Sequence, residues 1–303
     1  MAFIEMIDIT KEYKMKCRSE GRFHVLRDFF SPQYTSKRAV DGISLSIEKG
    51  ELVGYIGPNG AGKSTTLKML TGILVPTSGT IRIDGYEPYR NRKANALRMG
   101  AVFGQRSQLL WDLPVKDTLE LHQKMYKIDS STYTRNKAMY IDLLDMGGFL
   151  HQPARQLSLG QKMRANLALA LLHDPDILYL DEPTIGLDVI AKDQIRKFIR
   201  QINAEKNVTV MLTTHDMSDI EQICERLVLI DQGKNCLTER CKALSACIRA
   251  VMFCERCLSA QTLWYVMTGL LKSLEMVPRC ASESTRMCSD RAKRCVCWPK
   301  NIR

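Results

Sequence analysis

The sequence predicts an α/β fold with a largely parallel sheet, helices on its faces and a small inserted block of helices. Strand and helix patterns alternate over residues 160–234, which is typical of a parallel sheet with crossover helices. A short apolar run at 52–56 leads directly into a glycine-rich loop and a helical pattern. Between these two parts, residues 115–127 and 132–145 have helical spacing without an intervening strand, which predicts the inserted helices.

Each element has its own pattern. Residues 43–49 alternate between apolar and polar side chains and predict a strand that ends at the turn residue Gly50. The run LVGYI at 52–56 predicts a buried strand, because it is apolar throughout and short. The later elements are a helix at 160–173, a strand at 177–180, a helix at 191–205, a strand at 208–213, a helix at 217–225 and a strand at 227–230.

Length and composition exclude several classes of protein. A chain of 303 residues with 45% hydrophobic content can bury the core of one or two globular domains. Its longest stretch without charge, residues 257–271, is shorter than the ~20 apolar residues that cross a bilayer. The first residues, MAFIEMIDITKEYK, include acidic side chains and lack a long apolar run. We therefore expect no membrane span and no secretory signal, and a cytoplasmic location.

The net charge of +11 is unevenly distributed. Residues 235–303 carry 12 Lys and Arg against 5 Asp and Glu, a net charge of +7, which leaves +4 for residues 1–234. The same segment holds nine of the 11 cysteines. Because the excess does not lie on a folded face with stacking aromatics, no nucleic-acid partner is expected. We divide the chain into a domain at 1–234, with a helical subdomain at about 106–162, and a Cys-rich basic tail at 235–303.

Two interpretations of the tail remain open. Cys254 and Cys257 form a CxxC pair that could contribute to a zinc site, whereas Cys295 and Cys297 form CxC and lie far along the chain. The abrupt change in composition after residue 234 also fits a change of reading frame, which would leave the tail poorly folded. The frame change predicts that another frame of the gene encodes a cysteine-poor continuation.

The loop GPNGAGKST at 57–65 matches the complete phosphate-binding loop (P-loop) pattern. Its glycines let the backbone turn tightly and bring N–H groups within hydrogen-bonding distance of phosphate oxygens. The following helix adds the positive end of its dipole. In this pattern Lys63 neutralises the β- and γ-phosphates, and the Ser64 hydroxyl holds Mg²⁺. The sequence therefore predicts the sheet core of a P-loop NTPase.

An acidic pair follows the predicted strand at 177–180. Asp181 and Glu182 are adjacent at the strand end, so their side chains point to opposite sides. Asp181 can therefore face the metal while Glu182 faces the attacking water. By itself such a pair is an ordinary solvated turn, and the upstream P-loop favours the catalytic interpretation.

Further short motifs follow in an order typical of one family. They are AVFGQ ending at Gln105, LSLGQ at 157–161, Asp181-Glu182-Pro183, IGLD ending at Asp188, and LTTHD with His215. With these motifs, residues 5–234 resemble the ATP-binding subunit of an ABC transporter, and in detail the ATPases of ABC-2 type exporters. The signature departs from the family's LSGGQ, because Leu159 replaces its first glycine.

The resemblance implies a role for each matching residue. The catalytic residues would be Glu182, which polarises the water, His215, which fixes the geometry, and Lys63 and Gln105. The nucleotide-binding residues would be Tyr13, Gly57, Asn59, Gly60, Ala61, Gly62, Lys63, Ser64, Thr65, Ser158, Gly160 and Gln161. The residues that bind Mg²⁺ would be Ser64, Gln105 and Asp181.

Three of these residues also have a simpler, structural interpretation. Tyr13 is as easily a core aromatic as the residue on which adenine stacks. Ser158 is also a normal N-cap for the helix that follows it. A histidine after a strand, such as His215, is by itself more often structural than catalytic.

The resemblance further implies hydrolysis of ATP with Mg²⁺, to power a separate transmembrane permease subunit of an exporter. Because each chain has one P-loop and one LSLGQ, two chains are expected to pair head to tail, as a homodimer or with a paired ATPase subunit. Residues 106–118 would receive the permease on the inner face of the cell membrane, although Trp111 in this segment could merely pack the helical block. A soluble ABC-type ATPase acting on nucleic acid or ribosomes, and a non-hydrolysing remnant, remain as alternatives.

Overall fold

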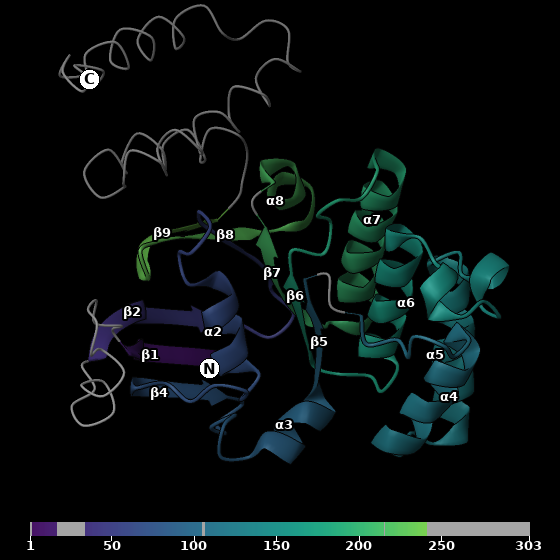
Figure 1. Ribbon diagram of the computed structural model, residues 1–303, viewed down its shortest axis with the longest axis horizontal. Helices are drawn as coiled ribbons and strands as arrows, with labels where there is room; N and C mark the ends of the chain where they lie inside the picture. Colours follow the sequence, from purple (N-terminus) through teal and green to yellow (C-terminus); the bar gives the residue numbers. More distant parts are fainter. Residues whose placement is uncertain (1, 17–33, 105–106, 215, 241–303) are drawn as a thin grey trace, which may run out of the picture.

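The computed structural model describes residues 2–16, 34–104, 107–214 and 216–240. Gln105, His215 and the tail beyond residue 240, including the cysteines of the zinc interpretation, lie outside the described residues. Figure 1 shows two sheets beside each other, with a group of helices at one end of the molecule.

A six-stranded sheet forms the centre, in the order β5-β6-β7-β3-β8-β9. Its strands are β3 (Leu52–Ile56), β5 (Met99–Phe103), β6 (Ile177–Asp181), β7 (Thr209–Thr214), β8 (Arg226–Asp231) and β9 (Lys234–Arg240). Neighbouring strands are parallel except for β8 and β9, which are antiparallel. Strands β3, β6 and β7 are buried along their whole length, as expected for a sheet covered on both faces.

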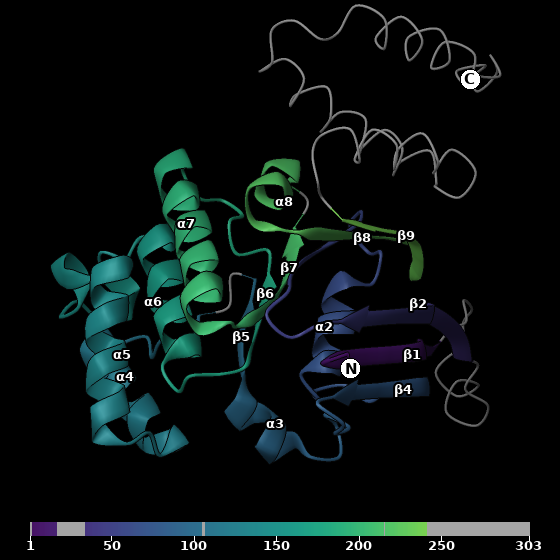
Figure 2. The same cartoon turned by 180° about the vertical axis from the view of Figure 1, so that it is seen from behind.

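A second, antiparallel sheet has the order β2-β1-β4. It consists of β1 (Ile4–Lys16), β2 (Tyr34–Ile47) and β4 (Ser78–Ile83). Helix α2 (Lys63–Leu70) lies between the two sheets in both views (Figure 2). Ile43 from this sheet, Leu67 from α2 and Val53 from β3 belong to one buried hydrophobic cluster, so the sheet is fixed to the core beside the P-loop.

The remaining helices cover the central sheet and extend from one end of it. They are α3 (Arg92–Arg98), α4 (Val115–Tyr126), α5 (Ser130–Leu143), α6 (Leu159–Leu171), α7 (Val189–Lys206) and α8 (Met217–Ile223), with 3-10 turns at Gly147–Phe149 and Ala154–Gln156. Helices α4 and α5 lie together at the end of the molecule, next to α6 (Figure 1). The predicted α/β fold with inserted helices is confirmed.

Two elements differ from the sequence prediction. The strand expected at 43–49 is the end of the longer β2, whose exposed first part is held by pairing with β1 rather than by a hydrophobic pattern. Strand β9 begins at Lys234 and pairs with β8, so the described sheet continues past the domain boundary predicted after residue 234. Among the described residues, no helix combines the length and the apolar character that crossing a membrane requires.

Candidate nucleotide-binding site

The P-loop joins the carboxyl end of β3 to the start of α2. Gly60 and Gly62 have φ angles of 85° and 105°, in the left-handed region that favours glycine. A Cβ at Gly57 would lie 2.3 Å from the carbonyl oxygen of Ile230, and one at Gly62 would lie 2.4 Å from that of Ala39. Close approach of backbone from β8 and β2 therefore requires glycine at positions 57 and 62.

Lys63, the first residue of α2, points back over the P-loop. Its side chain is buried, and its Nζ donates to the carbonyl oxygens of Gly57 at 2.6 Å and Pro58 at 3.1 Å. Burial lowers the pKa of Lys63, and the negative charges of Glu182 and Asp181 oppose that shift. The ammonium group thus lies between the P-loop backbone and the acidic pair, where it can interact with a phosphate.

Thr213, in β7, fixes the acidic pair. Its hydroxyl donates to Asp181 Oδ1 at 2.6 Å and accepts from the backbone N–H of Glu182 at 3.2 Å. The same N–H also donates to the Thr213 carbonyl oxygen at 2.9 Å. Glu182 has a φ of 53°, which is a strained conformation for a residue with a Cβ. These hydrogen bonds hold Glu182 in that conformation at the end of β6.

A cavity of about 340 Å³ opens between the P-loop and the three-stranded sheet. It is lined by Tyr13, Lys37, Ala39, Asn59, Gly60, Gly62, Lys63, Ser64, Thr65 and Glu182. Most of the residues assigned from the sequence to nucleotide binding, together with Glu182, therefore meet in one place. Tyr13 is 38% exposed, so it lines this cavity and is not a core residue.

Two residues of the site had not been identified from the sequence. Lys37 lines the cavity because β2 pairs with β1 in a register that places it opposite Tyr13. A long insertion separates these two strands, so no local pattern indicates this pairing. Thr213 binds both members of the acidic pair, and the Thr-Thr dipeptide before His215 was the available signal.

The signature residues lie apart from this cavity, at the start of α6. Ser158 Oγ accepts from the N–H of Gln161 at 3.2 Å, and Gln161 Oε1 accepts from the N–H of Ser158 at 2.9 Å. This is a capping box, so the N-cap interpretation of Ser158 is confirmed. A Cβ at Gly160 would lie 3.3 Å from the Cβ of Ala191, which brings the signature against the start of α7. Leu159 is the first residue of α6 and is compatible with this cap.

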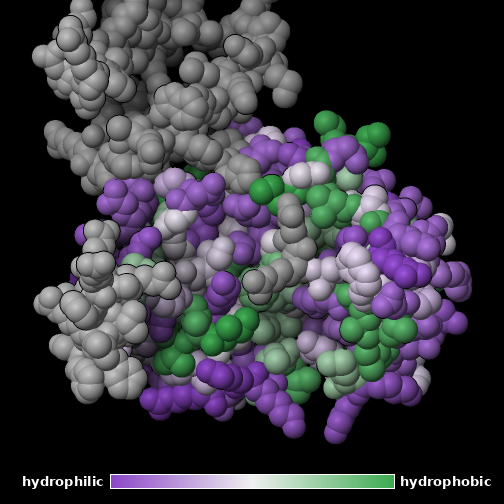
Figure 3. Space-filling model, viewed as in Figure 1, coloured by the Kyte–Doolittle hydropathy of each residue, from purple (hydrophilic) through white to green (hydrophobic). Residues whose placement is uncertain are grey.

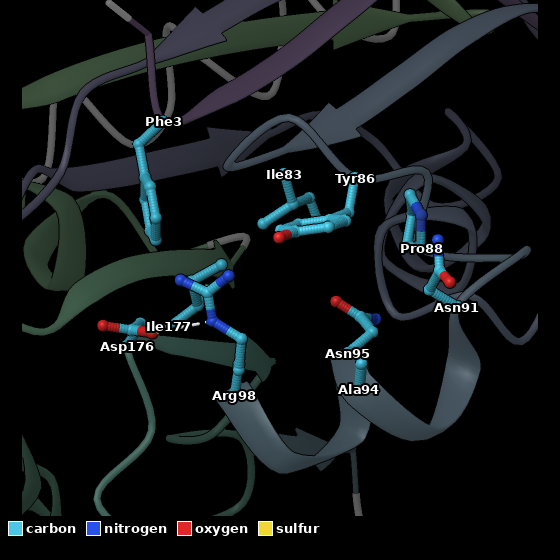
Figure 4. Close-up of a pocket in the computed structure, with 10 residues that line it drawn as sticks. All are labelled: Phe3, Ile83, Tyr86, Pro88, Asn91, Ala94, Asn95, Arg98, Asp176 and Ile177. Carbon is cyan, nitrogen blue, oxygen red and sulfur yellow. Dashed lines mark hydrogen bonds and ion pairs between the residues drawn. The ribbon is translucent and has the colours of Figure 1, made fainter.

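Figure 4 shows a different cavity, of about 230 Å³, between α3 and the amino end of β6. Phe3 and Tyr86 form part of its apolar wall, and Arg98 extends into it from α3. Arg98 is already paired with Asp176 at 3.0 Å and with Asp84 at 2.8 Å. This cavity lies at the opposite end of the strands from the P-loop, and its cation is neutralised. The P-loop cavity is therefore the candidate site.

Comparison with known proteins decides the family. A family model described as ABC transporter matches residues 40–185. The ABC transporter ATP-binding protein NatA of Bacillus subtilis (strain 168) is 34% identical over 200 residues, which are 65% of this chain and 80% of NatA. The chain belongs to the ABC transporter ATP-binding family.

Other proteins of this family are also similar to this chain. The bacitracin transport ATP-binding protein BcrA of Bacillus licheniformis is 34% identical over 204 residues, which are 66% of this chain and 64% of BcrA. The chain thus spans less than two thirds of the length of BcrA. The dimeric structure of the cassette MJ0796 in a post-hydrolysis state, bound to ADP and Pi, matches with a TM-score of 0.65 at 25% identity. That match covers 80% of this chain and 100% of the other.

Proposed function

We propose that this ABC cassette binds and hydrolyses ATP and thereby powers a separate membrane subunit, in an exporter of the ABC-2 type. The proposal depends on one observation, which is that Tyr13, the P-loop, Lys63 and Glu182 line the same cavity. Adenine can stack on the aromatic ring, and the P-loop can bind the phosphates. The carboxylate can then polarise the attacking water. BcrA and NatA, whose names describe transport proteins, support the transport role.

The chemistry is mostly positioning and electrostatics. Lys63 and the N–H groups of the P-loop offset negative charge on the β- and γ-phosphates. Ser64 and Asp181, with Gln105, fit Mg²⁺, because hydroxyl, carboxylate and amide oxygens are its preferred ligands. When bound, Mg²⁺ would neutralise further phosphate charge. Among the described residues, no group of three or more His, Cys, Asp or Glu side chains could hold a metal.

Glu182 acts as the base that orients and polarises the water. Its carboxylate lines the cavity, and Thr213 fixes its backbone at the end of β6. In this proposal His215 fixes the position of the water relative to the γ-phosphate. Asp181 is then left to the metal, and the hydrogen bond from Thr213 holds its carboxylate at the end of β6.

Pairing of two chains follows from the separation of the signature from the cavity. Ser158 is exposed at the N-terminus of α6, where free N–H groups can bind an anion. Next to it, α7 begins with Val189 and Ile190, which are 83% and 74% exposed. In the view of Figure 1, the upper end of α7 lies in a region where Figure 3 shows hydrophobic surface. A second copy would cover this apolar pair and receive Ser158 on its own nucleotide. ATP would then hold the closed pair together, and hydrolysis would release it.

The surface proposed for the membrane subunit is the loop around Trp111. Leu110 and Trp111 are 42% and 65% exposed, so Trp111 is not packed into the helical block. Lys162 Nζ lies 5.3 Å from the centre of the Trp111 ring, and the N–H of Arg155 donates to the Trp111 carbonyl oxygen at 3.0 Å. The loop is thus held in place while it presents an aromatic side chain to a partner. This arrangement would place the protein on the inner face of the cell membrane.

The test is Mg²⁺-dependent ATP hydrolysis by the purified protein and by Lys63→Ala. Removing the buried ammonium should abolish turnover, because it takes away the positive charge that lies between the P-loop backbone and the acidic pair. Lys68→Ala is the matched control, since Lys68 belongs to the same helix but is exposed and does not line the cavity. Equal hydrolysis by wild type and Lys63→Ala would remove the P-loop from the mechanism.

A further inference from the structure

Asp219, in α8, is a carboxylate with no exposed surface. Its Oδ1 accepts from Nε of Arg196 at 2.7 Å. Its Oδ2 accepts from two hydroxyl groups, those of Thr184 and of Thr214, the latter at 3.0 Å. One buried oxygen atom therefore joins two segments that are far apart in the sequence.

The two threonines belong to the two segments that carry the proposed catalytic groups. Thr184 follows Glu182 by two residues, and Thr214 directly precedes His215. Both threonines are 2% exposed, so water does not compete for their hydroxyl groups. A displacement of either segment relative to the other must stretch a hydrogen bond to Asp219.

The pair formed by Asp219 and Arg196 is itself anchored to two helices. Arg196, in α7, is 9% exposed and also donates to Ser218 Oγ at 2.8 Å and to Gln222 Oε1 at 3.2 Å. A buried ion pair is seldom the most stable choice, because desolvation offsets most of the attraction and apolar side chains of similar volume often do better. Stability alone therefore does not account for a charge at this place.

We propose that Asp219 is a positioning residue that holds the segments of Glu182 and His215 in a fixed relation through the hydroxyl groups of Thr184 and Thr214. The inference rests on the proposed ATPase function. Hydrolysis needs the base and the histidine on the same water, and small displacements of such groups are costly. ATP binding uses the P-loop and Tyr13, which belong to other segments, so it does not depend on this link.

The experiment removes the hydroxyl groups and leaves the ion pair in place. Thr184→Val and Thr214→Val keep the shape of the side chain, and Thr184→Ser and Thr214→Ser restore the hydroxyl. We expect each valine variant to lower kcat by about tenfold or more while KM for ATP stays close to wild type. The serine variants should recover most of kcat. Because both hydroxyl groups bind the same oxygen, the double valine variant should lose less than the product of the single losses.

Thr118→Val is the matched control. Thr118 is 1% exposed and its hydroxyl also donates to a protein oxygen, that of Pro114, but it belongs to α4. Either of two results would overturn the proposal. One is a fall in kcat that is as large in Thr118→Val as in Thr184→Val. The other is full kcat in both Thr184→Val and Thr214→Val. Thermal unfolding of each variant ensures that the comparison concerns folded protein. If wild type shows no hydrolysis that depends on Lys63, the proposed function itself fails, which is a different result.

Discussion

Glu182 is the residue on which the proposed hydrolysis depends most directly. Its backbone is strained, and its side chain lines the cavity. The Thr213 hydroxyl forms hydrogen bonds with both the backbone N–H of Glu182 and the carboxylate of Asp181. Strain of this kind persists only where the surrounding hydrogen bonds impose it. The acidic pair is thus held by hydrogen bonds of the protein itself, which is what the proposed base requires.

Glu182→Gln tests this role. The amide keeps the shape of the side chain but cannot accept a proton, so kcat should fall by about 10²-fold or more. ATP should still bind, because Lys63 and the P-loop are unchanged, and the variant should accumulate as a closed pair of chains. Hydrolysis of labelled ATP and sedimentation with and without ATP measure the two effects.

The control for this variant is Glu205→Gln, an exposed acid in α7 whose bond to Gln201 lies on the surface. It should hydrolyse ATP at the rate of wild type. If Glu182→Gln turned over normally, another group would have to be the base.

At the scale of single elements, the sequence predicts most of the fold and part of the site. The P-loop and the acidic pair could be identified because each occupies one continuous segment with its own pattern. Lys37 and Asp219 could not, because their roles depend on partners in strands and helices far along the chain. Strand register and helix packing are set by the whole core, and no local motif encodes them.

The loop before α4 and the first turns of α6 form a connected unit. Asn166, 4% exposed in α6, accepts from the N–H of Gln108 at 2.9 Å, and Lys162 lies against Trp111. Ser158 is the N-cap of α6, so a partner that pushes on Trp111 would also act on the signature. The proposed contact with a membrane subunit and the proposed cap over the second nucleotide would thus be mechanically linked.

Trp111→Ala should weaken stimulation by the membrane subunit while basal hydrolysis stays near that of wild type. An exposed tryptophan at the centre of an interface typically contributes about 2 kcal/mol or more to binding. ATPase activity of the chain alone and of the chain co-expressed with a candidate membrane subunit measures the two effects. Tyr86→Ala is the control, because Tyr86 is 59% exposed but lines the cavity at the other end of the strands. Equal loss of basal and stimulated activity would indicate that Trp111 only supports the fold.

At the scale of the whole molecule, the separation of cavity and signature determines how the protein can work. Ser158, at the N-cap of α6, is not among the residues that line the P-loop cavity of its own chain, so in the proposed mechanism the cap comes from a second chain. Two chains related by a two-fold axis complete two sites at once. The dimeric structure of MJ0796 with ADP and Pi provides a related assembly.

Mixing two defective variants tests this shared site directly. In a Glu182→Gln background, which prevents turnover, Lys63→Ala alone should not pair because it binds no ATP. Ser158→Arg alone should not pair because the arginine blocks the cap. A mixed pair, however, combines the intact P-loop of the Ser158→Arg chain with the intact Ser158 of the Lys63→Ala chain, and forms one complete site. Differently tagged chains should therefore co-purify only in the mixture and only with ATP, with about one nucleotide per pair. Pairing of either variant with itself to the same extent as in the mixture would show that the site is not shared between chains.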